Sequence, residues 1–157
     1  MNIQFTKKKD RKHTITCCRN DGTVTWMQVD DFFIFHDLMH YAVETTLQYK
    51  NAFYGMLAAG TNITDFELPK EQRPFNITPE AFNAECIVNL ALVEFSQGRV
   101  EDFNKALKDS YEKSEFTNEA PQFDHAAIEQ VHASFAALVL QWNTLPFGES
   151  LNLPFSE

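Results

Sequence analysis

The sequence predicts an α+β domain in which a small antiparallel sheet packs with about four helices, the first of them long and buried. Three observations predict this class. The first 29 residues are rich in β-branched side chains and contain a strong hairpin turn. The last residues again alternate apolar and polar side chains, as strands do. Four stretches between these ends carry apolar residues at helical spacing.

The composition indicates one globular domain over residues 1–157, with enough apolar residues for a real core. Hydrophobic residues make up 44% of the chain and include fifteen phenylalanines, which excludes a disordered protein. The formal net charge of −9 argues against binding to nucleic acid or to an anionic membrane surface. The chain starts without the apolar segment of a signal peptide, and its cysteines are odd in number, so we expect a reduced cytoplasmic location.

The expected sheet consists of an N-terminal hairpin, one further N-terminal strand and a C-terminal strand. The Asp21-Gly22 pair supplies the positive φ angles of a tight hairpin turn. Pro154 cannot donate a ladder hydrogen bond, so the last strand should lie at an edge of the sheet. These strands are expected at residues 2–6, 13–19, 23–28 and 151–155.

The pattern of residues 31–60 predicts one continuous helix at the centre of the domain, the longest of the chain. Asp30 or Asp31 can cap its N-terminus, and Gly60 stands where a left-handed residue ends a helix. Apolar residues occupy most of the circumference, which is typical of a helix covered by protein on several sides. The middle of the stretch is too polar to cross a membrane.

His36 and His40 are four residues apart on this helix, so both imidazoles lie on one face. Two histidines at this spacing can bind one divalent cation, as in the H-E-x-x-H motif of zinc proteases. The segment His36–His40 resembles that motif with Asp37 in place of the glutamate that acts as general base. The resemblance therefore implies metal ligation rather than proteolysis.

A third ligand is expected from Glu44 or Glu85. Glu44 follows His40 by one turn and could either bind the metal or accept a hydrogen bond that fixes an imidazole tautomer. Glu85 lies at the edge of the apolar face of the next helix, beside Asn89. The alternative for Glu85 is a boundary carboxylate paired to a lysine or to a backbone N–H.

Three more helices are expected, and the last also carries histidines. Thr78 is an N-cap, and Asp124 can cap the last helix. His125 and His132 lie two turns apart, about 10 Å along the axis, so they cannot share one ion without strain. Either could supply a fourth ligand, and His125 with Glu129 forms a rival site, although core-edge histidines are the simpler interpretation. The helices are expected at residues 78–97, 99–114 and 124–143.

Residues 61–77 form a long connection with two prolines and no sustained period. Connections of this length often cover a functional site. The alternative is a surface loop held down by Phe66 and Phe75.

The combined pattern resembles a family of small uncharacterised bacterial proteins. The resemblance spans nearly the whole chain and is most specific in the segment HDLxHYAVE, residues 36–44. Further matching features are Asp21-Gly22 and Trp26 in the hairpin, and the residues from Trp142 to Leu151 near the end. The family carries no assigned activity, so the resemblance implies the extent of the domain and no reaction.

The favoured hypothesis is a metal-binding protein, with metal-dependent hydrolysis as the activity to consider. His36, His40 and Glu85 would bind the metal, and Asp37 or Glu44 would accept a proton from a metal-bound water. Zinc fits this ligand set best, and iron, nickel or manganese are compatible with it. The substrate would be a small molecule that the sequence does not identify.

The main alternative is a non-catalytic binding or adaptor protein in which the histidines and Glu44 form a structural polar network. The sequence has no P-loop, no G-x-G-x-x-G, no G-x-S-x-G and no C-x-x-C motif, so nucleotide binding and acyl transfer lack support. A redox role for Cys17 or Cys18 ranks last. Adjacent residues on a strand point to opposite faces, and neither thiol has a neighbouring base in sequence.

Overall fold

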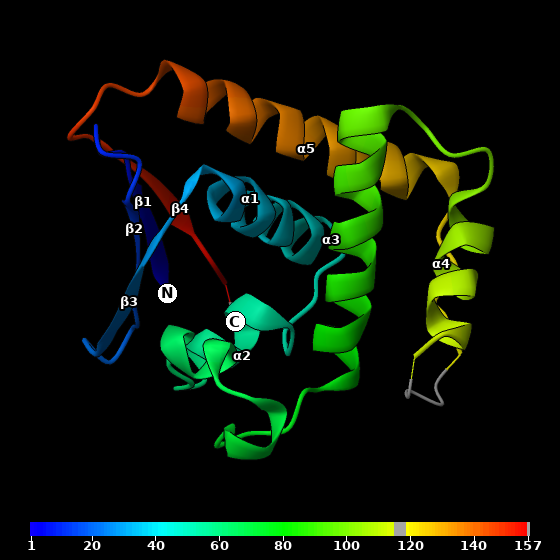
Figure 1. The fold of residues 1–157 in the computed structure, drawn as a ribbon, viewed down its shortest axis with the longest axis horizontal. Coiled ribbons are helices and arrows are strands. Elements are labelled where there is room, and N and C mark those ends of the chain that lie inside the picture. Colours follow the sequence, from blue (N-terminus) through cyan, green and yellow to red (C-terminus); the bar gives the residue numbers. More distant parts are fainter. Residues whose placement is uncertain (115–118, 157) are drawn as a thin grey trace.

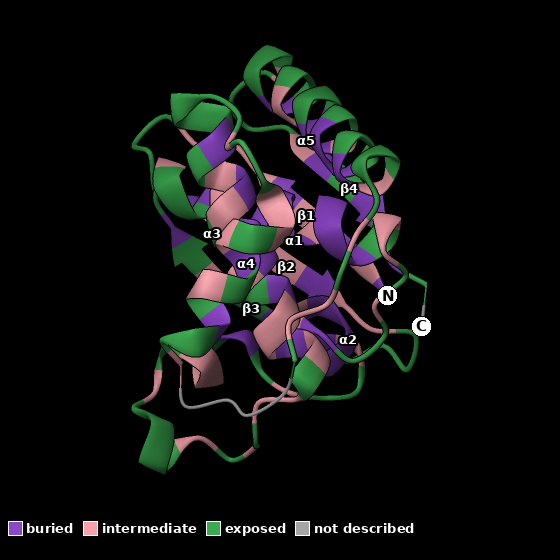
Figure 2. Cartoon of the chain, turned by 90° about the vertical axis from the view of Figure 1, so that its right-hand side faces the viewer, coloured by how far each residue is buried: buried purple, intermediate pink, exposed green. Residues whose placement is uncertain are grey.

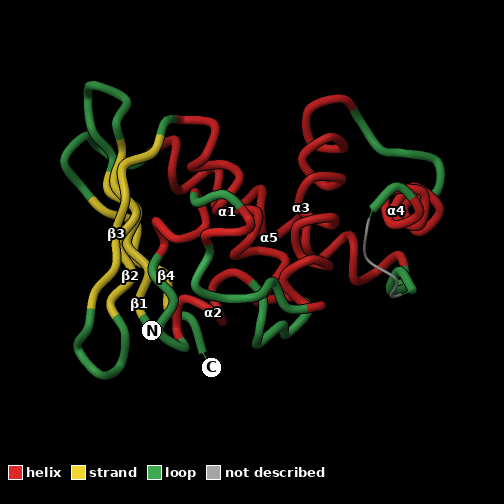
Figure 3. Tube along the Cα trace, turned by 60° about the horizontal axis from the view of Figure 1, so that its bottom comes forward, coloured by secondary structure: helices red, strands yellow, loops and turns green. Residues whose placement is uncertain are grey.

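A computed structural model describes residues 1–114 and 119–156, and it confirms the α+β class. All described helices lie on one side of a four-stranded antiparallel sheet (Figures 1 and 3). In chain order, the elements are β1 (Asn2–Thr6), β2 (His13–Cys18), β3 (Val24–Val29), α1 (Asp31–Thr46), α2 (Phe53–Ala58), the 3-10 turns η1 (Ile63–Glu67) and η2 (Lys70–Gln72), α3 (Pro79–Gln97), α4 (Phe103–Glu112), α5 (His125–Thr144) and β4 (Ser150–Pro154).

The sheet has the strand order β3-β2-β1-β4, so the C-terminal strand returns beside the N-terminal one. The predicted edge position of the strand that contains Pro154 is confirmed. Phe5 pairs with Ile15 on one side and with Leu151 on the other, and all three side chains are buried. Side chains alternate between the two faces along a strand, so this buried row identifies the face of the sheet that packs against the helices.

Helix α1 lies in the interior, between the sheet and the pair α3 and α5 (Figure 1). Asp30 caps the helix by accepting hydrogen bonds from the N–H groups of Phe32 and Phe33. Burial is concentrated on the inward faces of the helices, whereas the outer face of α5 is exposed (Figure 2). The long, buried first helix is therefore confirmed. Its fully buried apolar residues are Ile34, Leu38, Met39, Ala42 and Val43.

The prediction of one continuous helix over residues 31–60 is wrong. Helix α1 ends at Thr46, Gln48 takes a left-handed φ of 57°, and α2 begins only at Phe53. As a result α1, with 16 residues, is shorter than α3 and α5. The returning chain brings the carbonyl oxygen of Lys50 to within 2.0 Å of where a Cβ on Gly55 would stand. A continuous helix needs no such approach, and only glycine permits it here.

The side chain of Glu44 takes the place of a local cap at the start of α2. The N-cap residue Ala52 makes no side-chain cap hydrogen bond. Instead, Oε2 of Glu44 accepts a hydrogen bond of 2.9 Å from the N–H of Tyr54. A fully buried carboxylate on α1 thus joins two helices, and it also reaches the candidate site.

The long connection between α2 and α3 is held down by aromatic contacts. The ring of Phe66 lies 4.9 Å from that of Phe53 on α2 and 4.6 Å from that of Phe75. Arg73 donates hydrogen bonds to the carbonyl oxygens of Leu68 and Phe66. These contacts favour the pinned surface loop over a lid.

Candidate metal centre

The packing of α1 against α3 brings three predicted ligands together. Nε2 of His40 lies 3.1 Å from Oε2 of Glu85, and Nε2 of His36 lies 3.6 Å from Oε1 of the same carboxylate. The donor atoms of the three residues lie within 4.8 Å of one another. Within residues 1–114 and 119–156, no other three histidine, cysteine, aspartate or glutamate side chains converge in this way. The structure therefore contains a His/His/Glu cluster of the predicted composition.

The spacing of the donor atoms is compatible with a small cation. Neighbouring ligands of a tetrahedral zinc ion, each bonded at about 2.0–2.1 Å, are separated by about 3.3 Å. The two nitrogen–oxygen distances from Glu85 fall close to this value on either side. To hold one ion, any wider pair among the three groups, up to 4.8 Å apart, would have to close towards the same value.

Each imidazole also contacts a carboxylate through its other ring nitrogen. Nδ1 of His40 lies 3.2 Å from Oε1 of Glu44, and Nδ1 of His36 lies 3.2 Å from Oδ1 of Asp37. A carboxylate on Nδ1 holds the proton there and leaves Nε2 free to bind a metal, which is the usual arrangement behind metal-binding histidines. Asp37 and Glu44 thus lie behind the rings, on the side away from Glu85.

The electrostatics of the cluster favour a bound positive charge. Burial alone would lower the pKa of His40, but the hydrogen bonds to Glu44 and Glu85 outweigh it and raise this pKa to about 10. The pKa of His36 is raised in the same way, against its burial, by Asp37 and Glu85. The pKa of Glu85 is lowered, because both imidazoles stabilise its carboxylate more than burial opposes it. Burial raises the pKa of Glu44, which the adjacent imidazole only partly offsets.

The cluster is open to solvent on one side. Glu85 is 49% exposed at its side chain, and Nδ2 of Asn89 donates a hydrogen bond of 2.9 Å to its Oε1. The exposed rings of Phe32 and Phe33 both lie against the imidazole of His36. On the closed side, the ring of Phe53 packs 5.2 Å from that of His40. The carboxylate of Glu85 is thus the most exposed part of the cluster, and the imidazole of His40 is the most enclosed.

The histidines of the last helix do not join the cluster. His125 is exposed, with its Nε2 4.0 Å from Glu129. His132 is buried and bonded through Nε2 to Oε2 of Glu94 at 2.7 Å. The same carboxylate also binds Arg99, which extends to Glu129. Among the described residues, the fourth-ligand and rival-site hypotheses therefore find no converging geometry.

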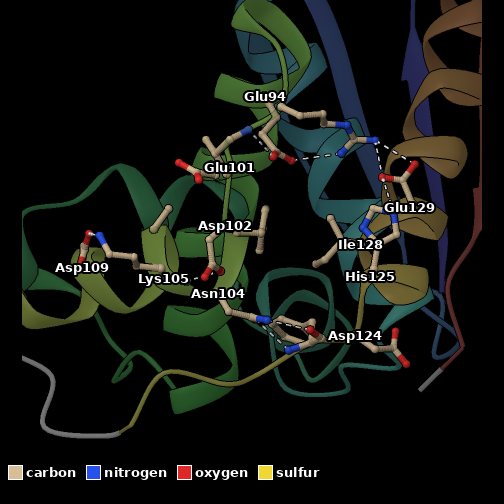
Figure 4. A pocket seen from close by; sticks show the side chains of 15 residues that line it. Glu94, Glu101, Asp102, Asn104, Lys105, Asp109, Asp124, His125, Ile128 and Glu129 are labelled. Carbon is tan, nitrogen blue, oxygen red and sulfur yellow. Dashed lines mark hydrogen bonds and ion pairs between the residues drawn. The ribbon is translucent and has the colours of Figure 1, made fainter.

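A cavity of about 860 Å³ lies apart from the cluster, between the end of α3, α4 and the start of α5 (Figure 4). Glu94 of α3 and Glu129 of α5 both line it, together with His125 on α5 and Asp124, the N-cap residue of that helix. None of the lining residues belongs to the His/His/Glu cluster. Of the two histidines on α5, His125 lines this cavity and His132 does not.

Cys17 and Cys86 offer little support for redox chemistry. Cys17 is fully buried, and burial raises the pKa of its thiol to about 12. Burial likewise raises the pKa of Cys86 to about 11. A thiol becomes reactive when its pKa is lowered, so neither residue has the character of a catalytic thiolate.

Three features of the site were not anticipated from the sequence: the cap that Glu44 provides for α2, and the aromatic contacts of His36 and of His40. The cap depends on the break after α1, which no proline marks in the sequence. The aromatic contacts of His36 have a signal in the sequence. Phe32 and Phe33 precede His36 by four and three residues, and side chains at these spacings meet on a helix.

Comparisons of the chain with protein-family models, with curated proteins and with solved structures find no match. Among the described residues, no helix combines the length and apolar character that crossing a membrane requires. Function is therefore inferred from the geometry of the cluster.

Proposed function

We propose that this protein binds a divalent transition metal, with zinc as the preferred ion, through His36, His40 and Glu85. The observation that carries the proposal is the orientation of the two imidazoles. Both present Nε2 to Glu85, while each Nδ1 contacts its own carboxylate. Packing alone does not require the two rings to take the same orientation, whereas metal ligation does.

A charge count supports a cation at this position. Three carboxylates, those of Asp37, Glu44 and Glu85, surround two imidazoles. With neutral imidazoles the cluster carries a charge of −3, and either two protons or one divalent cation bring it to −1. Asp37, His40 and Glu44 are buried, and buried charges need such compensation. A metal and protons therefore compete for the same place.

We propose hydrolysis of a small molecule as the activity. Three protein ligands leave a coordination position for water, whose pKa a bound zinc lowers to about 7. The open side beside Asn89 would admit the substrate. Asp37 and Glu44 were predicted as proton acceptors, but their contacts on Nδ1 suit them better to holding the rings. Their role as bases stays a prediction.

The alternative function is that of a binding or adaptor protein with a structural polar network. One observation favours it: without any metal, all four ring nitrogens of His36 and His40 already have a carboxylate within 3.6 Å. In that case protonated imidazoles would stabilise the packing of α1 on α3, and the protein would neither bind zinc nor respond to chelators.

Zinc titration of chelator-treated protein by calorimetry tests the proposal. We expect one zinc per chain, with binding lost in His36→Ala and in His40→Ala. His125→Ala is the matched control, because this histidine is 89% exposed and outside the cluster. Circular dichroism should show that all three variants are folded.

Two results would contradict metal binding. One is a wild-type protein that takes up no zinc, iron, nickel or manganese. The other is zinc uptake that His36→Ala and His40→Ala leave intact while His125→Ala removes it. Unchanged thermal stability with and without chelator would then support the structural network.

A further inference from the structure

Two adjacent phenylalanines in the first turn of α1 expose their side chains to solvent. Phe32 is 65% exposed and Phe33 is 49% exposed, although phenylalanine is among the residues most often buried. Their backbone N–H groups bind the cap residue Asp30, a contact that any residue other than proline can make. The cap therefore does not account for two phenyl rings at these positions.

The two phenyl rings form the exposed end of a row of aromatic rings. Both contact the imidazole of His36, at centroid distances of 6.4 Å for Phe32 and 6.2 Å for Phe33. The ring of His36 lies 4.8 Å from that of His40, which in turn lies 5.2 Å from the ring of Phe53. These spacings are those of favourable aromatic pairs. His36 and His40 thus have ring neighbours on both sides, whereas the phenyl rings end the row at the surface.

Burial increases steadily along the same face of α1. Phe32, His36, His40 and Glu44 follow one another at intervals of four residues, so they lie on one stripe of the helix. Phe32 is exposed, the side chain of His36 is 16% exposed, that of His40 is 4% exposed and that of Glu44 is 0% exposed. Along this stripe, the candidate metal centre is therefore closed towards Glu44 and open towards Phe32.

The phenyl rings lie within reach of a small molecule bound to the metal. A metal bonded to Nε2 of His36 at about 2.0–2.1 Å would be at most about 10 Å from the centroid of either phenyl ring. Aromatic rings contact one another at centroid separations of about 4.5–7 Å. A ring joined directly to a metal-binding group therefore bridges the distance, whereas a methyl group in its place is too short.

We propose that the substrate of the candidate metal centre is a small aromatic molecule, whose ring packs against Phe32 and Phe33 while an adjacent oxygen group binds the metal. This inference rests on the proposed metal-binding function. Two observations select an aromatic group: the exposed rings contact a predicted ligand directly, and they end a row of aromatic contacts that a further ring would extend. The two phenylalanines would thus determine specificity, and the metal would hold the reacting group.

Two metal-binding probes test the proposal on the zinc-loaded protein. Benzohydroxamate and acetohydroxamate present the same metal-binding oxygen atoms, but the first carries a phenyl ring where the second carries a methyl group. Calorimetric titration should show that benzohydroxamate binds at least about tenfold more tightly, because its ring leaves water to pack against the phenylalanines. Equal affinities for the two probes, or a preference for acetohydroxamate, would overturn the proposal.

Single substitutions show whether the two phenylalanines carry this preference. In Phe32→Ala and in Phe33→Ala the preference for benzohydroxamate should fall at least about threefold, because part of the apolar contact is lost. Zinc affinity should equal that of the wild-type protein, since neither residue supplies a ligand. Phe147→Ala is the matched control: this phenylalanine is 56% exposed, its ring lies against Lys7, and its loss should leave the preference unchanged.

The outcomes separate this inference from the function on which it rests. If chelator-treated protein takes up no metal, the probes have no ion to bind, and both proposals are wrong. If the protein binds zinc but the preference for benzohydroxamate is absent, only the aromatic substrate is wrong. The same holds if the preference persists undiminished in both Phe32→Ala and Phe33→Ala, or falls equally in Phe147→Ala.

Discussion

Glu44 shows how one residue serves two purposes in this protein. Its two carboxylate oxygens are divided between Nδ1 of His40 and the backbone N–H of Tyr54. The carboxylate is fully buried, so both hydrogen bonds are made without competition from water. The orientation of a candidate ligand is therefore tied to the start of a neighbouring helix.

We predict that Glu44→Gln weakens zinc binding by about 10–100-fold. The N–H of Tyr54 requires an acceptor, so the glutamine oxygen should face Tyr54 and its NH₂ group should face His40. Nδ1 must then accept a hydrogen bond, which moves the imidazole proton to Nε2 and blocks ligation. Calorimetric titration with zinc measures this change.

Glu129→Gln serves as the control for this substitution, because Glu129 lies on α5 outside the cluster. Its zinc affinity should equal that of the wild-type protein. Equal affinities for Glu44→Gln and wild type would show that the contact with His40 does not set the tautomer.

Cys17 gives a prediction for the dependence of stability on pH. Its pKa is raised by burial from 9.0 to about 12, so above pH 9 the folded protein keeps a proton that the unfolded chain loses. Stability is therefore complete below about pH 9 and falls as the pH rises towards 12, by at most about 1.4 kcal/mol per unit for one group. Urea denaturation should show a shallower alkaline decline in Cys17→Ala than in wild type. Parallel declines in the two proteins would contradict this account.

At the scale of elements, the connection between α1 and α2 departs most from the sequence-based expectation. Gln48 adopts a left-handed conformation, and the backbone of Lys50 presses against Gly55. The turn also places the N-terminus of α2 over Glu44. The break therefore contributes to the geometry of the candidate site.

We predict that Gly55→Ala lowers the free energy of unfolding by about 3 kcal/mol, because the added methyl would overlap the backbone oxygen of Lys50. Alanine is the better helix former by about 1 kcal/mol, so helix propensity alone would give the opposite sign. Urea denaturation distinguishes the two. Gly60→Ala, where a Cβ meets nothing within 4 Å, should lose only the cost of its left-handed backbone, about 1–2 kcal/mol.

Local signals predicted α3 and α5 to within about one residue, whereas α4 begins at Phe103, after its cap Asp102, rather than at residue 99. Thr78 and Asp124 cap α3 and α5, as expected from residue type alone. The break after Thr46 escaped prediction because no proline marks it, and Gly55 stands inside the next helix rather than in the turn. Only the packing of the folded chain shows why glycine is needed there.

At the scale of the whole molecule, the sequence anticipated part of the candidate site. The spacing of His36 and His40 follows from helical geometry, so their common face was predictable. The approach of Glu85 depends on how α3 crosses α1, which no residue pattern determines, so the sequence alone does not decide between Glu44 and Glu85 as the third ligand. The orientations of the imidazole rings depend on Asp37 and Glu44 and emerge only in the fold.

The proposed metal site is tested most directly by a crystal structure of the zinc-treated protein, with anomalous scattering measured on both sides of the zinc absorption edge. The account predicts one anomalous peak about 2.0–2.2 Å from Nε2 of His36, Nε2 of His40 and a carboxylate oxygen of Glu85. A map with no peak between these three groups, or with zinc bound only elsewhere, would contradict it.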